Sequence, residues 1–478
     1  MTSFAALLPL LAIVGGALCV MLLEAFLRRE DKEYLGYISL VTLFVSGGFS
    51  VWLWGRDLAY FGGNLALDRP AIVLGLALVL AGVFLVLMSL KYISRQDMNH
   101  GEYYALLLLA LSGAVIMVSS TSLLVIFLGL ETLSVSSYAL AGLKRKDPKS
   151  SEAAVKYFLM GSFASAFLVF GLALLYGAAG SLEFAGIRAA LSGPAGGPGV
   201  AGWAGLALVI AGFGFKIALV PFHMWAPDVY EGAPTPVTAF FSIGPKLAGF
   251  AVLFRFLSPI WTQGGAQPVI YRFLWVVAAL TMVVGNLAAL RQKNLKRLLA
   301  YSSIAHSGYI LLAVLAGDGA SLVFYFVAYL FMNAGAFSAL IAMSRRGTEY
   351  LTLEDFSGIG FKYPWIGASF ALFLFSLAGF PPTAGFLAKF YVFGAAVRQG
   401  EVALVVIAVL ASLVSVFYYL RIIVFMYMKD PLAGVDIETD NPALYLVLFL
   451  CFYGVLQLGI WPGNLLVIIR QAVAFLVR

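Results

Sequence analysis

The chain has 478 residues, of which 62% are hydrophobic and only 11% are charged, and its mean hydropathy is +0.97. A soluble domain needs about a quarter charged residues to cover its surface, so this composition excludes a soluble protein and indicates a membrane protein. The formal net charge is +7. The basic residues lie in short segments between apolar stretches rather than on one folded face, which argues against nucleic-acid binding. Cys19 and Cys451 stand alone in apolar stretches, a pattern that disfavours zinc or iron–sulfur ligation.

Apolar stretches long enough to cross a bilayer recur along the whole chain. A span needs about 20 apolar residues to cross a hydrocarbon core of roughly 30 Å, and the sequence holds about fourteen such stretches. We therefore predict an all-α polytopic membrane protein that forms a single membrane domain over residues 1–478. The predicted spans are 4–27, 35–54, 71–93, 103–119, 121–142, 152–177, 202–225, 235–258, 270–290, 299–316, 319–344, 365–397, 402–428 and 442–469.

Basic residues are concentrated in every second loop. Two of these loops hold Lys144, Arg145, Lys146 and Lys149, and Arg291, Lys293, Lys296 and Arg297. Because cytoplasmic loops carry the excess of lysine and arginine, this set of loops is predicted to be cytoplasmic. Both termini then lie on the outer side of the membrane, which requires an even number of spans.

Two predicted spans are interrupted by proline near a lysine. Pro221 follows Lys216 in the seventh span, and Pro381 and Pro382 precede Lys389 in the twelfth. Proline breaks the helix, and the freed carbonyls are tolerated only against protein or a water-filled cavity. The breaks lie an odd number of spans apart, so a five-helix repeat would place its second copy upside down.

We therefore expect two inverted five-helix repeats. The first would hold helices 4–8 within residues 101–260, and the second helices 9–13 within 265–430. Three N-terminal helices (1–100) would precede them and one C-terminal helix (440–478) would follow. In this scheme the discontinuous helices are the seventh and the twelfth, which occupy corresponding positions in the two repeats.

Four charged residues lie well inside predicted spans: Glu131, Lys216, Lys246 and Lys389. At about 1.5 Å per residue, all four reach a similar depth near the middle of the membrane. A lysine at that depth costs roughly 3 kcal/mol on insertion scales, so it is normally retained for a function. A carboxylate and amines at one depth can exchange protons when small rearrangements change which group is better stabilised. This pattern predicts a proton relay; the other interpretation is that each charge is a structural ion pair between helices.

Two histidines are further candidates. His306 lies about one and a half turns into the tenth predicted span, where it is either a relay residue or a hydrogen-bonded core histidine. His223 follows Pro221 closely and either serves proton uptake or caps the broken helix. The sequence contains no dinucleotide-binding, P-loop or zinc-protease motif, so we expect no nucleotide site, metal site or redox centre in this chain.

Four segments share their order with a known family. They are GLKRKDPKSSEAAVKYFLMGSFASA, PFHMWAPDVYEGAPTPVTAFFSIGPK, QKNLKRLLAYSSIAHSGY and SLAGFPPTAGFLAKFYVF. Together they resemble subunit N of the proton-pumping NADH-quinone oxidoreductases (respiratory complex I), within the wider family of antiporter-like subunits and cation/proton antiporters. The resemblance covers most of the chain, and VYEGAPTPVTAF followed by a GPK lysine is more similar to subunit N than to its paralogues L and M.

The resemblance implies a subunit that translocates protons with energy from quinone reduction elsewhere in the complex. By position, Glu131 matches the family's carboxylate on the fifth helix, Lys216 the lysine of the broken seventh, Lys246 the lysine of the eighth and Lys389 the outlet lysine of the broken twelfth, while His306 falls in a polar central stretch. The resemblance further implies the inner membrane of a bacterium, subunits M and K as neighbours, and flavin, iron–sulfur clusters and quinone bound by other subunits.

Three alternatives remain open from the sequence. The chain resembles subunits of freestanding cation/proton antiporters, and it resembles membrane subunits of ferredoxin- or hydrogenase-linked complexes. It is also compatible with a purely structural membrane scaffold in which the buried charges hold helices together.

Overall fold

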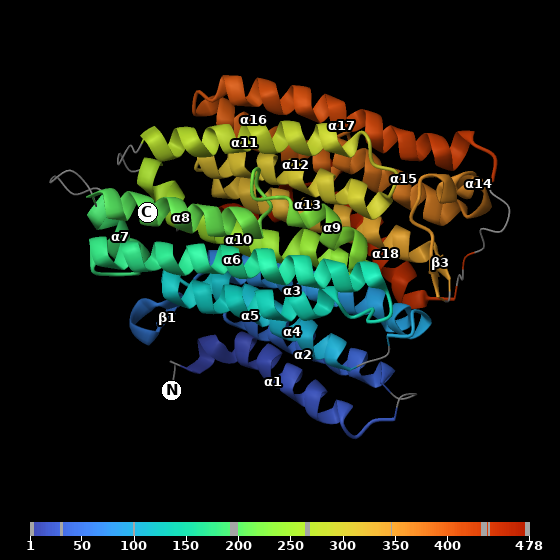
Figure 1. The fold of residues 1–478 in the computed structure, drawn as a ribbon, viewed down its shortest axis with the longest axis horizontal. Helices are drawn as coiled ribbons and strands as arrows, with labels where there is room; N and C mark the ends of the chain where they lie inside the picture. Colours follow the sequence, from blue (N-terminus) through green and yellow to red (C-terminus); the bar gives the residue numbers. More distant parts are fainter. Residues whose placement is uncertain are drawn as a thin grey trace.

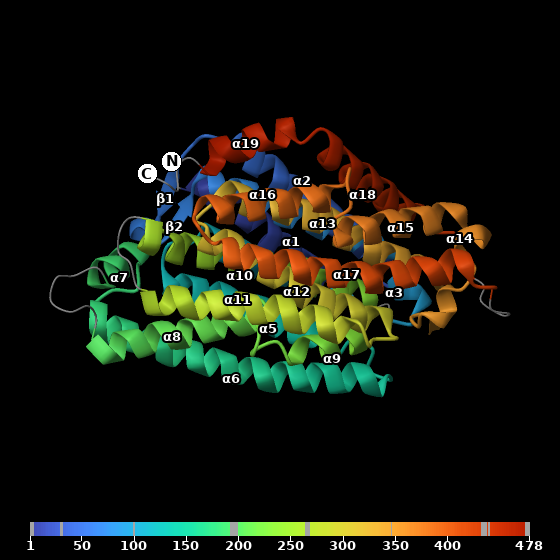
Figure 2. The same ribbon diagram turned by 90° about the horizontal axis from the view of Figure 1, so that it is seen from above.

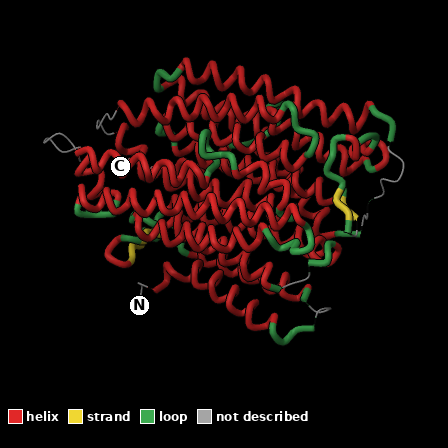
Figure 3. Tube along the Cα trace, viewed as in Figure 1, coloured by secondary structure: helices red, strands yellow, loops and turns green. Residues whose placement is uncertain are grey.

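The computed structural model describes residues 4–28, 32–98, 101–191, 199–262, 268–345, 347–431, 437 and 440–473. Long helices lie side by side in one bundle (Figures 1 and 2), and 81% of the structure is helical. Within the described residues, strands form only two short antiparallel hairpins (Figure 3). The predicted fold class, an all-α polytopic membrane protein, is confirmed.

The elements follow one another along the chain with short connections. The first ten α-helices are α1 (Leu8–Glu24), α2 (Glu33–Trp52), α3 (Arg69–Arg95), α4 (Glu102–Ser119), α5 (Leu123–Ala141), α6 (Pro148–Ala179), α7 (Phe184–Leu191), α8 (Gly199–Lys216), α9 (Trp225–Gly232) and α10 (Thr235–Thr262). The others are α11 (Pro268–Ala289), α12 (Leu295–Leu315), α13 (Gly319–Ala342), α14 (Ile359–Lys362), α15 (Pro364–Ala378), α16 (Ala384–Arg398), α17 (Val402–Met428), α18 (Pro442–Ile460) and α19 (Gly463–Val473).

The remaining elements are short. Three 3-10 helices occupy Phe4–Leu7, Phe61–Gly63 and Glu354–Phe356. Strands β1 (Leu58–Tyr60) and β2 (Leu65–Leu67) pair antiparallel, as do β3 (Ser344–Arg345) and β4 (Thr348–Glu349).

Thirteen helices among the described residues are long and apolar enough to cross a membrane, and counting one bent pair, 354–362 with 364–378, raises the number to fourteen. The seventh predicted span, 202–225, covers α8 and the break at 217–224, while the second helix after this break, α9, lies beyond the predicted end of the span. The twelfth span is α15 and α16, separated by 379–383. Both proline-containing spans are therefore broken, as predicted.

Two further predicted boundaries are wrong, besides the end of the seventh span. The last predicted span, 442–469, is interrupted: α18 ends at Ile460, and α19 begins only after Pro462, whose ring cannot continue a helix. The tenth span begins at Leu295 rather than at residue 299, so Lys296 and Arg297 belong to a helix and not to a loop. Asn294 explains this start, because its side-chain oxygen accepts a hydrogen bond from the Arg297 amide at 3.1 Å and so caps α12.

The centre of the bundle consists of α3, α10, α12 and α13. Every residue in the apolar window of α10 is buried, and 94% are buried in α12, against only 28% in α6. A helix that is apolar on all sides belongs in the interior. The outward side chains of α6, such as Phe163 and Phe170, are exposed and apolar, as a lipid-facing surface requires.

The helix contacts recur in two sets. Helix α4 packs on α5 as α11 packs on α12, and α10 contacts α4 as α17 contacts α11. Helix α6 contacts both pieces of the broken span α8–α9, as α13 contacts both pieces of α15–α16. This correspondence supports the expected repeats, while the division into segments 1–100, 101–260, 265–430 and 440–478 stays a prediction.

The start of α1 and the end of α19 lie at the same end of the bundle, opposite α14 (Figures 1 and 2). The β3–β4 hairpin lies at the α14 end (Figure 1). The basic loops predict that this end is cytoplasmic, and we call it the predicted cytoplasmic end.

Candidate functional site

Lys216 is the last residue of α8, at the edge of the first helix break. Its side chain is buried, and its Nζ donates to Ser134 Oγ at 2.8 Å and to Tyr157 OH at 3.3 Å. The ammonium also lies 5.4 Å from the centroid of the Tyr157 ring, within the range of a cation–π interaction. After Lys216 the chain turns away, and Ala218 adopts a positive φ of 57°.

Glu131 lies on α5, one turn before Ser134, and its side chain is partly exposed at the side of the bundle. It accepts a hydrogen bond from Ser165 Oγ of α6 at 2.5 Å. Glu131 and Lys216 thus each bond to a serine rather than to each other. Ser134, Ser165 and Lys216 line one small cavity of about 10 Å³, close to the lower limit for a single water molecule.

Lys246 lies in the middle of α10 and is 1% exposed. Its Nζ donates to the Ser303 carbonyl at 2.5 Å and to Ser307 Oγ at 2.8 Å, both on α12. The Ser307 hydroxyl in turn donates to the Ile217 carbonyl at 2.8 Å. Ile217 follows Lys216 in the helix break, so one hydroxyl joins the break of the seventh span to the lysine of the eighth.

Lys389 lies on α16, just after the second break. Its Nζ donates to the Leu377 carbonyl at 3.1 Å, the Ala378 carbonyl at 2.8 Å and Ser412 Oγ at 2.8 Å. The two carbonyls are the last of α15, which the break leaves without intrahelical partners. The ammonium also lies 5.1 Å from the ring centroid of Tyr309 on α12.

His306 lies on α12 within the segment 303–309, which holds the residues that contact Lys246 and the one that contacts Lys389. It is buried, its Nδ1 is 2.7 Å from Tyr325 OH, and its ring centroid is 5.6 Å from that of Tyr309. Ser307 follows His306 directly in the sequence. Helix α12 therefore carries a row of polar groups from one lysine to the other.

His223 lies within the first break, two residues before α9 begins. Its side chain is half-buried, and its Nδ1 is buried without a hydrogen-bond partner among the described residues. Helix α9 separates His223 from the predicted cytoplasmic end by about 12 Å at 1.5 Å per residue. Among the described residues, no hydrogen bond joins His223 Nδ1 to these lysines.

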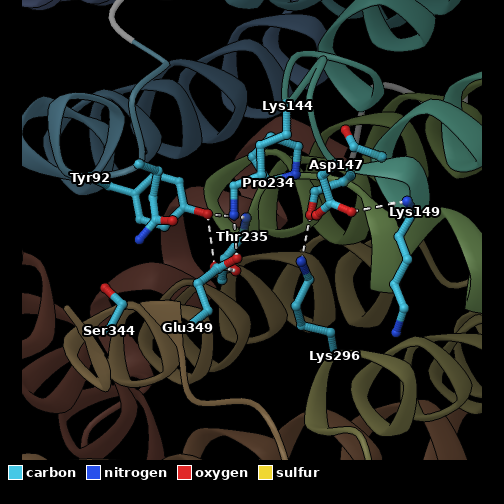
Figure 4. A network of polar contacts seen from close by, with 12 residues as sticks. Tyr92, Lys144, Asp147, Lys149, Pro234, Thr235, Lys296, Ser344 and Glu349 are labelled. Atoms are coloured by element: carbon cyan, nitrogen blue, oxygen red, sulfur yellow. Dashed lines mark hydrogen bonds and ion pairs between the residues drawn. The ribbon is translucent and has the colours of Figure 1, made fainter. Parts of the chain in front are cut away.

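Sequence reasoning missed three buried charged residues. Lys296, assigned above to a loop, is 2% exposed on the first turn of α12. Arg255 of α10 is 6% exposed and pairs with Asp68 at 2.6 Å. Glu349 of β4 accepts hydrogen bonds from three side chains at the predicted cytoplasmic end (Figure 4).

The sequence contained a signal for Lys296 and one for Asp68, the partner of Arg255. Asn294, a good helix cap, stands two residues before Lys296, which favours a helix that begins earlier than hydropathy suggests. Asp68 precedes Arg69-Pro70 as a helix cap, so an acidic group at the outer end of α3 was predictable. For Glu349, which follows a short loop, no pattern in the sequence indicated burial.

Within the described part of the chain, no group of three or more His, Cys, Asp or Glu side chains is placed to hold a metal ion. The chemistry that the geometry offers is proton transfer. Amines, a carboxylate, an imidazole and hydroxyls lie in sequence across the middle of the bundle, and each can accept or donate a proton.

Comparisons with known proteins place this arrangement in a family. Residues 120–415 match the family model described as NADH:quinone oxidoreductase/Mrp antiporter, TM. NADH-quinone oxidoreductase subunit N of Trichlorobacter lovleyi is 43% identical over 97% of this chain and 95% of its own length.

Solved structures agree. A chain of respiratory complex I from Thermus thermophilus is 35% identical, with a TM-score of 0.83, over 96% of this chain and 98% of its own. A chain of the Mrp complex from Dietzia has the same fold, with a TM-score of 0.85 and 22% identity over 99% of this chain and 97% of its own. The chain therefore belongs to the antiporter-like membrane subunits of the NADH-quinone oxidoreductases, in the subunit N family.

Proposed function

We propose that the chain is a proton-translocating subunit in the membrane arm of a NADH-quinone oxidoreductase. Quinone reduction elsewhere in the complex supplies the energy, and this chain moves protons without a redox site of its own. One observation carries the proposal: the ammonium groups of Lys246 and Lys389 both contact α12, at Ser307 and at Tyr309. His306 directly precedes Ser307, and its ring lies 5.6 Å from that of Tyr309. A buried charge with a purely structural role needs only one partner. Here a single helix, α12, contacts two buried lysines, Lys246 and Lys389, and so joins them.

The proposed path begins at Glu131 and Lys216. Each bonds to a serine that lines the same small cavity, so a change of charge near Glu131 alters how well the cavity stabilises a proton on Lys216. The proton then passes by way of Ser307 to Lys246, and through His306 and Tyr309 to Lys389. Lys389 releases the proton on the outer side, because α16 runs from the second break away from the predicted cytoplasmic end.

The neighbours in this proposal are subunits M and K of the same complex. We place one of these contacts on the outward face of α5 beside Glu131, where Leu128 and Val135 are 56% and 61% exposed. The complex lies in the inner membrane of a bacterium, with both termini of this chain outside. Flavin, iron–sulfur clusters and quinone bind to other subunits.

The alternative is a subunit of a cation/proton antiporter or of a ferredoxin- or hydrogenase-linked complex. The fold alone fits all of these, because the Mrp chain shares it at 22% identity. The identity of 43% to a subunit N over 97% of the chain favours the oxidoreductase. Co-purification with flavin and iron–sulfur proteins in mild detergent separates these cases.

Substitutions at the first pair test the proposal. Lys216→Ala and Glu131→Ala in the assembled complex should sharply lower NADH-driven proton pumping, measured with a pH-sensitive dye in membrane vesicles. Lys91→Ala is the matched control, because Lys91 pairs only at the surface, with Asp440 at 2.9 Å, and such pairs contribute little. Normal pumping by assembled Lys216→Ala and Glu131→Ala complexes would refute the relay, and loss of assembly alone would favour a scaffold.

A further inference from the structure

A buried polar cluster lies at the predicted cytoplasmic end, away from the four mid-membrane charges. Glu349 accepts hydrogen bonds from Lys144 Nζ at 2.7 Å, Tyr92 OH at 2.8 Å and Thr235 Oγ1 at 2.5 Å. Figure 4 shows these side chains converging on Glu349 from separate elements, with Lys296 approaching from α12. The cluster therefore joins α3, the loop after α5, α10, α12 and the β3–β4 hairpin.

Glu349 holds a permanent negative charge in this cluster. Its side chain is only 12% exposed. Burial alone would raise the pKa of the Glu349 carboxyl, but the ammonium groups of Lys296 and Lys144 outweigh burial and lower this pKa to about 2. At neutral pH the carboxylate compensates for positive charge on the two lysines beside it.

A polar stripe on α10 leads from this cluster into the membrane. Thr235, Thr238, Ser242 and Lys246 recur every three or four residues, which places them on one face of the helix. All four are buried, so the stripe faces protein and not lipid. It begins at the hydroxyl that contacts Glu349 and ends at the central lysine.

A second stripe, on α12, faces the first. Lys296, Ser303 and Ser307 are seven and four residues apart and thus share one face. Helices α10 and α12 pack against each other. We call the space between these stripes the α10–α12 seam; its inner end is the hydrogen bond between Lys246 and Ser307.

Hydrogen bonds recur along the seam from its cytoplasmic end to its inner end. Lys296 Nζ donates to the Ala233 carbonyl, and Thr238 Oγ1 donates to the same carbonyl at 3.4 Å and to the Tyr230 carbonyl at 2.9 Å. The Tyr230 hydroxyl lies 3.4 Å from Ser303 Oγ. Ser303 is the residue whose carbonyl receives the ammonium of Lys246.

A surface cavity gives water access to the cluster. It has a volume of about 530 Å³ and is lined by residues 96–98, 143–148 and Gly347. Liquid water occupies about 30 Å³ per molecule, so the cavity holds several waters. Lys144, which bonds to Glu349, is part of its wall.

We propose that Glu349 and Lys296 form the cytoplasmic mouth of the relay, through which protons pass along the α10–α12 seam to Lys246. This inference rests on the proposed function. After Lys296 has passed its proton on, its neutral amine accepts another from a hydronium ion of the cytoplasmic water, which becomes water, and the charge of Glu349 stabilises the ammonium that forms. The proton then moves over the seam hydroxyls and bridging water to the amine of Lys246, and Lys296 becomes neutral again. Glu349 is a positioning residue: it carries no proton itself.

The test compares variants in the assembled complex in membrane vesicles, with pumping measured per complex. Glu349→Gln keeps the acceptor oxygen for Tyr92 and Thr235 but removes the charge. We expect pumping to fall roughly tenfold or more, as when a positioned proton-transfer group is lost, with the amount of complex unchanged. Lys296→Met should give the same loss, and Glu349→Asp should restore most of the pumping.

The control is Asp440→Asn, which removes a carboxylate whose side chain is 87% exposed, paired with Lys91 on the same side of the protein. It should pump as wild type. If Lys246→Ala loses pumping while Glu349→Gln and Lys296→Met pump normally, the mouth lies elsewhere and this inference is overturned, although the proposed function stands. Loss in His223→Ala alone would move uptake to the first helix break and would also overturn it.

Two further outcomes complete the test. Fewer assembled complexes with wild-type pumping per complex would assign the cluster a structural role and overturn the inference. Wild-type pumping by both Lys216→Ala and Lys246→Ala would refute the proposed function itself, independently of Glu349.

Discussion

The ion pair between Arg255 and Asp68 is predicted to stabilise the attachment of α3 to the first repeat. Arg255 donates to Asp68 through two nitrogens, at 2.6 and 3.4 Å, and to the Val118 carbonyl at 2.7 Å. The two side chains are 5% and 17% exposed. Removing one partner of a buried pair costs about 3–5 kcal/mol, because the other charge stays buried without compensation.

Asp68→Ala is the informative change. It strands the guanidinium of Arg255 and also removes the cap of α3, where Asp68 accepts from the Ala71 amide at 2.9 Å, worth about 1 kcal/mol more. At 1.4 kcal/mol per factor of ten, a loss of about 3 kcal/mol shortens the half-life of heat inactivation about a hundredfold if the transition state for unfolding has lost the pair. Arg255→Leu should cost less, because the Asp68 carboxylate that it leaves is more exposed than the guanidinium, at 17% against 5%, and still accepts from the Ala71 amide.

The assay is the decay of NADH-driven quinone reduction by the detergent-solubilised complex at one elevated temperature. The double variant Asp68→Ala/Arg255→Leu should lose less than the sum of the single variants, because the two groups interact directly. Pumping per surviving complex should stay at the wild-type level, since neither residue contacts the relay lysines. A wild-type half-life for Asp68→Ala, or strict additivity in the double variant, would refute this account.

Two further predictions concern pH and packing. Since the pKa of Glu349 is lowered from 4.5 to about 2, its stabilisation is complete above pH 4.5 and is lost as the pH falls toward 2; the difference in heat stability between wild type and Glu349→Gln should therefore shrink over that window. A Cβ on Gly205 would lie 2.8 Å from the Gly171 carbonyl, so Gly205→Leu should separate α8 from α6 and reduce the amount of assembled complex on native gels, whereas Gly177→Leu, with no atom within 4 Å, should assemble normally.

The spans and their breaks were predictable because each depends on local sequence. Hydropathy places a helix in the membrane wherever about 20 apolar residues follow one another, and proline removes a backbone hydrogen bond that a helix needs. Proline alone does not decide a break, because α10 continues through Pro245 and Pro259. The common depth of Lys216, Lys246 and Lys389 in the membrane stays a prediction. The break at Trp461-Pro462 was missed because the residues on either side of it are largely apolar.

The partners of those residues were not predictable. Which helix faces which depends on the rotation of each helix in the bundle, and hydropathy does not encode rotation when a helix such as α10 is buried on all sides. Tyr157, for example, lies on α6 and became a partner of Lys216 only through packing. Glu349 was hidden for a related reason: a loop carboxylate is ordinarily solvated, and three distant elements bury this one.

The contacts of α12 with the first repeat bear on the ancestry and the engineering of the chain. Its Ser303 and Ser307 serve Lys246 in the first half, while its own half contains Lys389, which lies over Tyr309. A polypeptide cut between the halves would deprive Lys246 of both its hydrogen-bond partners. An ancestor with a single repeat would have needed those serines from a second copy of itself, in an antiparallel dimer. The fused halves have therefore become mutually dependent, and exchanging one half between relatives should succeed only when α12 travels with α10.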